Sequence, residues 1–222
     1  MPTILITGAS RGLGLEFARQ YAAAGWRVLA TLRDPLAGRA ASEAGAEVYV
    51  ADVADVASLH RLKASIKDVC LDVVLNNAGI YGQNQDFGAV DAEGFMRVMR
   101  TNALAPLQVA EIFADQVPAG GIIAAVSSKM GSMTENSSGG FYAYRASKAA
   151  LNMVIKSLSM DLRDRSVAVV ALSPGWVRTD MGGANAPLEP PQAVAGMRAV
   201  LDRVTLAESG KFIHYDGTEV AW

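Results

Sequence analysis

Tyr144 and Lys148 stand four residues apart in a stretch whose apolar spacing predicts a helix. Side chains one helical turn apart share a face, so the phenol and the ammonium group would be neighbours. A nearby cation favours the phenolate and lowers the pKa of the phenol, which makes the phenol a better acid–base catalyst. The other tyrosine of this segment, Tyr142, has Ala146 at the same spacing and lacks such a partner. Taken alone, the pair also fits two exposed side chains on an amphipathic helix.

Two hydroxyl groups, those of Ser127 and Ser128, follow an apolar stretch that predicts a strand over Gly121–Val126. In open parallel sheets, ligands bind at the carboxyl ends of strands, which is where these hydroxyls would lie. Either serine could orient a substrate there, or it could simply cap or turn the chain.

A glycine-rich loop follows the first predicted strand and leads into a helical pattern from Leu13 onward. Glycine lets the backbone turn tightly and approach a pyrophosphate, and the N–H groups at a helix start attract the negative charge. The spacing is GxxxGxG, which differs from the GxGxxG fingerprint, and a tight connection without a ligand is the alternative. The loop predicts a dinucleotide site formed by Gly8, Ser10, Arg11, Gly12, Leu13 and Gly14.

The end of the second predicted strand indicates which dinucleotide is bound. An acidic residue there would accept hydrogen bonds from the ribose hydroxyls of NAD, whereas a cation would suit the additional phosphate of NADP. Leu32 occupies the position expected for an acid, and Arg33 follows it. Arg11 could point at the same phosphate. The sequence therefore predicts NADP(H), with two solvated surface arginines as the alternative.

Two further turns follow predicted strands. Asp52, followed by Val53, could cap a helix or contact the adenine through its carboxylate, and the local sequence favours neither role. Asn77, Ala78 and Gly79 offer amide groups and a close backbone approach after the fourth strand, although an ordinary turn would look the same. We expect all five residues to lie at the dinucleotide.

Short apolar strands alternate with amphipathic helical segments along the chain, which is typical of a mostly parallel, doubly wound α/β sheet of about seven strands with helices on both faces. No repeat or linker interrupts this alternation, so we expect one dinucleotide-binding and catalytic domain over residues 1–222. The strands are expected at Thr3–Thr7, Arg27–Thr31, Glu47–Val50, Val73–Leu75, Gly121–Val126, Val167–Leu172 and Lys211–His214.

Composition narrows the class of partner. The 222 residues carry a formal net charge of only -2, which gives no support for a nucleic-acid or polybasic membrane surface and leaves a small molecule as the expected partner. One cysteine and two histidines make a poor supply of metal ligands, so we expect no metal site and a reducing, cytoplasmic setting. The sequence shows neither a signal peptide at its start nor an apolar run of about 18 residues, so we expect no membrane attachment.

Taken together, these motifs resemble the short-chain dehydrogenase/reductase family over nearly the whole chain. The family's order of motifs is present in the Thr7 to Gly14 loop, the Asn76 to Gly79 turn, Asn102 in a helical stretch, the serine pair, Tyr144-x-x-x-Lys148, and the segment from Pro174 to Thr179.

The resemblance implies a role for each of these residues. Ser128 would orient a substrate carbonyl, Tyr144 would donate the proton, and Lys148 would lower the pKa of Tyr144 and hold the ribose. Asn102 would support a proton relay through water. The nicotinamide would be fixed by Pro174, Gly175, Val177 and Thr179. The family also implies a homodimer, or a tetramer, built through the helices that contain Asn102 and Tyr144.

Within the family, the stretch from Gly175 to Gly183 and the ending from Tyr215 to Thr218 resemble the branch of sniffer-type carbonyl reductases and bacterial C-factor proteins. The segment after Thr179 reaches helical sequence quickly, near Gln192, whereas Lys129–Gly140 is longer than usual. A short cover implies an open pocket with broad specificity, bordered by Ile80, Tyr81, Met130, Met133, Tyr142 and Trp176. The function expected is NADPH-dependent reduction of an aldehyde, ketone or quinone; the alternative is a dinucleotide-binding signalling protein of the C-factor type.

Overall fold

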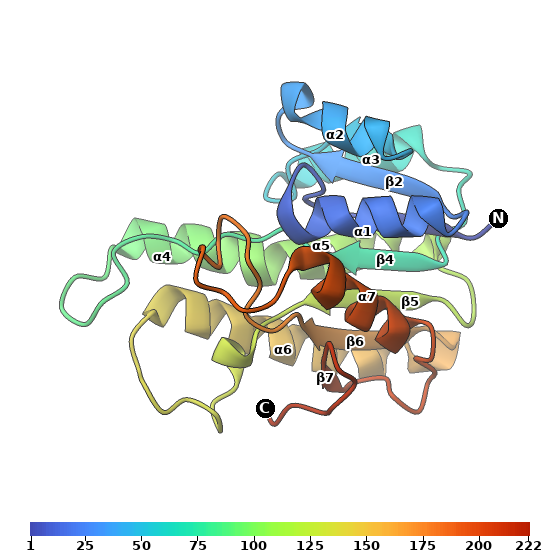
Figure 1. The fold of residues 1–222 in the computed structure, drawn as a ribbon. Coiled ribbons are helices and arrows are strands. Elements are labelled where there is room, and N and C mark those ends of the chain that lie inside the picture. Colours follow the sequence, from blue (N-terminus) through green and yellow to red (C-terminus); the bar gives the residue numbers. More distant parts are fainter.

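The computed structural model describes residues 1–222, which form one parallel sheet of seven strands in the order β3-β2-β1-β4-β5-β6-β7 (Figure 1). The chain winds outward from β1 in one direction and then, after β3, returns to continue from β4 in the other. This is the doubly wound arrangement predicted from the sequence, and the prediction is confirmed. The strands are β1 (Thr3–Ile6), β2 (Arg27–Leu32), β3 (Glu47–Val50), β4 (Val73–Asn76), β5 (Ile122–Val126), β6 (Ala168–Ser173) and β7 (Phe212–His214).

Helices cover both faces of the sheet, as expected. On one face, α1 and α7 pack against side chains such as Ile4 and Ile122, and on the other α3, α5 and α6 pack against Leu5 and Ile123. Because consecutive strand residues point to opposite faces, a strand covered on both sides must be apolar throughout, as β5 and β6 are. The helices are α1 (Gly12–Ala23), α2 (Arg39–Glu43), α3 (Val56–Ser65), α4 (Ala92–Met99), α5 (Ala105–Phe113), α6 (Tyr142–Asp161) and α7 (Pro190–Leu201).

The first strand and the first helix differ from the predicted bounds. β1 ends at Ile6 because Gly8 adopts a positive φ of 69°, which turns the chain away from the sheet and leaves Thr7 in the loop. α1 begins at Gly12, one residue before the start of its apolar periodicity. The predicted start was one residue late because a glycine has no side chain to contribute to that periodicity.

The carboxyl ends of the strands share one edge of the sheet, and α4 and the first turns of α6 extend beyond that edge (Figure 1). A π-helical segment, Arg100–Leu104, joins α4 to α5. β1 and β4 are neighbours although their connections run in opposite directions, so a crevice opens between their ends. This is the position at which the glycine loop and Asn77 meet.

No helix of the protein has the length and the apolar character needed to cross a membrane.

Candidate active site

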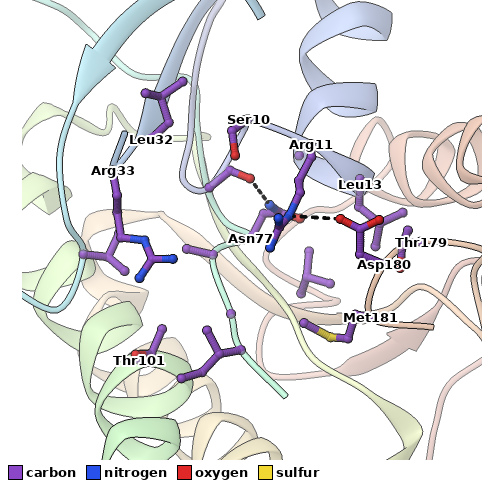
Figure 2. Close-up of a pocket in the computed structure, with 18 of the residues that line it drawn as sticks. Ser10, Arg11, Leu13, Leu32, Arg33, Asn77, Thr101, Thr179, Asp180 and Met181 are labelled. Carbon is purple, nitrogen blue, oxygen red and sulfur yellow. Dashed lines mark hydrogen bonds and ion pairs between the residues drawn. The ribbon is translucent and has the colours of Figure 1, made fainter. Parts of the chain in front are cut away.

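A cavity of about 610 Å³ lies at the carboxyl edge of the sheet. Its walls come from the glycine loop, the ends of β2, β4 and β5, the first turns of α6 and the segment after β6. Figure 2 shows residues of the glycine loop, of the ends of β2 and β4 and of the segment after β6 around this cavity. All the residues predicted to hold the cofactor line this cavity, except Gly175 and Val177. The predicted residues that line the cavity are Gly8, Ser10, Arg11, Gly12, Leu13, Gly14, Arg33, Asp52, Val53, Asn77, Ala78, Gly79, Tyr144, Lys148, Pro174 and Thr179.

The glycine loop is tied to the end of β4. Asn77 donates its side-chain amide to the carbonyl oxygens of Thr7 and Gly8, both at 3.0 Å, and the Thr7 hydroxyl accepts from the backbone N–H groups of Asn77 and Ala78 at 3.0 and 3.1 Å. A Cβ added at Gly14 would collide with the Gly8 carbonyl oxygen and lie 2.5 Å from the Asn77 amide nitrogen. Only glycine therefore permits this close packing.

The start of α1 is open toward the cavity. Arg11 is its N-cap residue, and no side chain accepts a hydrogen bond from the first-turn N–H groups. Those free donors, together with the positive end of the helix dipole, form a cradle for a phosphate group. The residues present thus fit the pyrophosphate of a dinucleotide.

The two arginines expected beside the adenine ribose lie apart. Figure 2 shows Arg33 near Leu32 at the end of β2, whereas Arg11 is turned toward Asp180. The Arg11 Nε lies 3.4 Å from an Asp180 carboxylate oxygen, and both side chains are exposed. An exposed ion pair of this kind stabilises a fold by less than about 1 kcal/mol, so a phosphate can compete for Arg11.

Tyr144 lies in the first turn of α6, with its side chain buried against the cavity. Burial raises the pKa of the phenol to about 12, and a hydrogen bond with the Ser128 side chain opposes that shift. The ring of Tyr81 packs against it, with the two ring centroids 4.7 Å apart. The phenol is therefore held protonated at neutral pH.

Lys148 lies one turn further along the same helix, with its Nζ 5.7 Å from the centroid of the Tyr144 ring. The ammonium group donates a hydrogen bond to the Val126 carbonyl oxygen at 2.8 Å, and burial lowers the pKa of Lys148 to about 8. The expected fall in the pKa of Tyr144 is not found. Burial dominates both shifts, and it penalises the charged amine that would have stabilised the phenolate.

The two serines at the end of β5 have different surroundings. Ser127 donates to the side-chain oxygen of Asn152 at 2.6 Å, and both residues are buried. Ser128 accepts from the Met130 N–H at 3.2 Å and reaches the phenol of Tyr144. Ser127 thus lines the cavity and Ser128 does not, whereas Ser128 is the hydroxyl beside the Tyr144 phenol.

Asn102 does not line the cavity but lies fully buried behind it, in the π-helical segment. Its side chain accepts from the Ile80 N–H at 2.9 Å and donates to the Ile80 carbonyl at 2.8 Å and to the Ser147 hydroxyl at 3.0 Å. Ser147 donates in turn to the Tyr144 carbonyl at 2.7 Å. Asn102 therefore connects the loop after β4 to the helix that carries Tyr144, and its proton-relay role stays a prediction.

Of the two roles left open for Asp52, the structure excludes one, and two other predicted positions lie away from the cavity. Asp52 does not cap a helix, since α3 begins four residues later and Asp55 caps it by accepting from Ala57. The carboxylate of Asp52 accepts instead from the Ala54 N–H at 2.9 Å, within a turn that borders the cavity. Val177 is buried in a bridge with Leu188, and Gly175 packs beside Tyr215, so neither faces the cavity.

Several residues of the cavity wall were not predicted. Thr101 precedes Asn102 in the chain, and Asp180 follows Thr179, so their places beside predicted residues are the only local signals. The others are small or apolar, or follow a strand end without a distinctive pattern. The added lining residues are Asp34, Ala37, Ala51, Thr101, Val126, Asp180 and Met181.

A doubly wound parallel sheet with a glycine-lined cavity at its switch point is the architecture of Rossmann-type oxidoreductases. A family model described as short chain dehydrogenase matches residues 2–189. The chain belongs to the short-chain dehydrogenase/reductase family of oxidoreductases, and the resemblance stated from the motifs is confirmed.

Three similar proteins illustrate the range of the family. C-signal from Myxococcus xanthus is 45% identical over 166 residues, which cover 72% of this chain and 100% of that protein. The structure of carbonyl reductase Sniffer of D. melanogaster matches with a TM-score of 0.90 at 31% identity, covering 100% of both chains. A carbonyl reductase from Pseudomonas aeruginosa PAO1, solved in complex with NADP, matches with a TM-score of 0.89 at 34% identity over 100% of both chains.

Proposed function

We propose that the protein is an NADPH-dependent reductase of small-molecule carbonyl compounds, with Tyr144 as the proton donor. The observation that carries this proposal is the buried Tyr144 phenol, which lies beside Ser128 and lines the same cavity as the phosphate-binding glycine loop. A proton donor beside a dinucleotide site is the arrangement that carbonyl reduction requires.

Bound NADPH supplies the hydride that the carbonyl carbon accepts. The Ser128 hydroxyl orients the carbonyl oxygen, and the Tyr144 phenol gives it a proton as negative charge develops there. Lys148, anchored on the Val126 carbonyl, holds the cofactor's ribose and supplies a buried amine next to the phenol. Burial of Tyr144 and Lys148 excludes water from both groups.

Arg33 supports the choice of NADPH over NADH. It lines the cavity beside Leu32, which occupies the strand-end position where an acid would bind the ribose hydroxyls of NAD. The nearby Asp34 also lines the cavity, but its carboxylate accepts a hydrogen bond from the Leu36 N–H at 2.9 Å. Arg11 joins it when the pair with Asp180 opens. A guanidinium matches phosphate geometry with two parallel hydrogen bonds, which favours the phosphorylated cofactor.

The test is turnover of a panel of aldehydes, ketones and quinones with each nucleotide. We expect carbonyl-dependent oxidation of NADPH with a kcat/KM at least about tenfold above that with NADH, the ratio that roughly 1.4 kcal/mol provides. The segment after β6 is short and leaves Trp176 and Met181 exposed, which supports a broad substrate range. Absence of turnover across the panel, or preference for NADH, would count against the proposal.

The 45% identity to C-signal favours a second candidate, a dinucleotide-binding signalling protein with incidental catalysis. The same panel separates the two, because a signalling protein with incidental catalysis would bind NADPH and reduce the carbonyls only slowly. The intact group of Ser128, Tyr144 and Lys148 favours the reductase.

We further propose that residues 1–222 form a single dinucleotide-binding and catalytic domain built on the one sheet. We also propose that the protein is a cytoplasmic homodimer. Met96 on α4 and Met153 on α6 are 65% and 66% exposed and give these helices apolar surface for a second copy. Sedimentation equilibrium would distinguish a monomer, a dimer and a tetramer.

A further inference from the structure

The loop between β4 and α4 buries one polar side chain, that of Gln85. Gln85 is only 6% exposed, whereas the neighbouring Gln83 and Asn84 are exposed. The loop turns sharply at Gly82, with a φ of 87°, and again at Asn84, with a φ of 51°. These turns direct Gln85 inward toward the start of α6, which lies beside this loop in Figure 1.

The start of α6 has no cap of its own. The residue before it, Phe141, adopts a left-handed conformation with a φ of 50° and offers no side-chain acceptor. Gln85 supplies the missing acceptors from a distant part of the chain. Its backbone oxygen accepts from the Tyr142 N–H at 3.3 Å, and its side-chain oxygen accepts from the Tyr144 N–H at 2.7 Å. First-turn N–H groups need such partners when they are buried.

The other end of the same amide holds a second aromatic residue. Gln85 Nε2 donates to the Tyr81 carbonyl at 2.7 Å. The Tyr81 ring packs on the Tyr144 ring, and the centroid of the Phe141 ring lies 5.7 Å from that of Tyr81. One buried amide therefore links the backbones of Tyr81 and Tyr144, and both its donor and its acceptor are used.

We propose that Gln85 is a positioning residue that fixes the Tyr144 phenol, and the Tyr81 ring against it, relative to the bound nucleotide. This proposal rests on the proposed function of Tyr144. The reason is geometric, because a proton donor must stay within hydrogen-bonding reach of the carbonyl oxygen, and a displacement of about 1 Å costs up to about a hundredfold in rate. Only glutamine joins the two backbones, since asparagine is shorter and glutamate has no donor.

The test replaces Gln85 with methionine, which keeps the length and removes both hydrogen bonds. Gln85→Met should lower kcat about ten- to hundredfold, while the Kd for NADPH changes by less than about twofold. The matched control is Gln83→Met in the same loop, where the side chain is exposed and outside the cavity wall, and kcat should be unchanged.

Hydrogen exchange of the full-length protein provides a readout that does not need turnover. The amide of Tyr144 should exchange faster in Gln85→Met than in the wild type or in Gln83→Met, because its acceptor is gone. Gln85→Glu keeps the acceptor, so this amide should stay protected. The new carboxylate near Tyr144 should raise the pKa of the phenol and move the alkaline limb of the kcat profile to higher pH.

Each outcome decides between the roles. Faster exchange with an unchanged kcat would make Gln85 a structural cap only, and the positioning role would be wrong. An equal loss of kcat and of NADPH affinity would also overturn it, since that pattern indicates general loosening of the fold. A wild-type protein that binds NADPH and reduces no carbonyl would refute the proposed function. A loss of kcat in Gln85→Met, with wild-type kcat in Gln83→Met, would support both the proposed function and the positioning role of Gln85.

Discussion

At the scale of single residues, burial gives Tyr144 and Lys148 opposite shifts. The pKa of the phenol rises to about 12 and that of the amine falls to about 8, in both cases because the charged form is poorly solvated. A phenol that stays protonated across the neutral range is suited to give a proton, which is the direction of carbonyl reduction.

Removing the phenol oxygen tests the role of Tyr144. Tyr144→Phe should lower kcat by about 10² to 10⁴, the usual contribution of general acid catalysis, with little change in the Kd for NADPH. Tyr49→Phe is the matched control, because that ring lies on β3 outside the cavity wall, and its kcat should stay at the wild-type value. Steady-state kinetics and a fluorescence titration with NADPH measure the two quantities; a Tyr144→Phe enzyme with full kcat would exclude the phenol as the donor.

The buried lysine should make the stability of the protein depend on pH. The unfolded chain keeps this group protonated up to the usual pKa of 10.5, whereas the folded protein releases the proton from about pH 8. The unfolded state binds more protons between these values, so the free energy of unfolding rises with pH across that window. At neutral pH the buried charge is therefore a cost to the fold.

Lys148→Met keeps the shape of the side chain and removes that cost. The variant should be more stable than the wild type by about 1–3 kcal/mol near neutral pH, and the difference should shrink as the pH rises from about 8 to 10. It should also lose most of its turnover. Urea unfolding at several pH values measures the difference in the free energy of unfolding between the variant and the wild type. A difference that does not vary with pH would show that the amine is not buried in its charged form.

At the scale of elements, the site depends on how closely β1, α1 and the end of β4 approach one another. Gly14 occupies the closest point, where a side chain would meet both the Gly8 oxygen and the Asn77 amide. The backbone is then near enough for the first-turn N–H groups of α1 to reach a phosphate.

Gly14→Ala should therefore weaken the binding of NADPH as well as lower the stability of the fold. We expect a loss of about 1–3 kcal/mol in the free energy of unfolding from overpacking, together with at least about tenfold weaker binding of NADPH. Gly25→Ala, beyond the other end of α1, is the control: its positive φ of 80° also strains an alanine, but no atom lies within 4 Å and the cavity is distant. A Gly14→Ala protein with unchanged NADPH affinity would place the phosphate elsewhere.

The elements were largely predictable because their signals are local. The apolar runs of β5 and β6, the periodicity of α6 and the glycines around the start of α1 each stand in one stretch of sequence, and their order led to the doubly wound sheet. The positions that escaped prediction depend on contacts across the chain. The hydrogen bond from Tyr144 to Gln85 spans 59 residues, and the pair of Arg11 with Asp180 joins two loops. The cap role left open for Asp52 was excluded only once the start of α3 was known, because Asp55 caps that helix.

At the scale of the whole molecule, the cavity joins parts of the chain that are far apart in sequence. Its wall includes Gly8 after β1, Arg33 after β2, Asn77 after β4 and Thr179 after β6. A ligand that contacts all of these strand ends favours the folded state over the unfolded one, because only the folded chain brings them together. The melting temperature of the protein therefore reports binding at this site.

Thermal unfolding with each nucleotide tests the choice of cofactor on the molecule as a whole. A ligand at one hundred times its Kd stabilises a protein by about 2.7 kcal/mol, which for a chain of this length raises the Tm by roughly 5–10 °C. NADPH should produce this shift, and NADH at the same concentration a smaller one. Arg33→Gln should reduce the shift with NADPH toward that with NADH, whereas Arg39→Gln, paired with Glu43 outside the cavity, should not. Equal shifts with both nucleotides in the wild type would mean that Arg33 does not bind the additional phosphate.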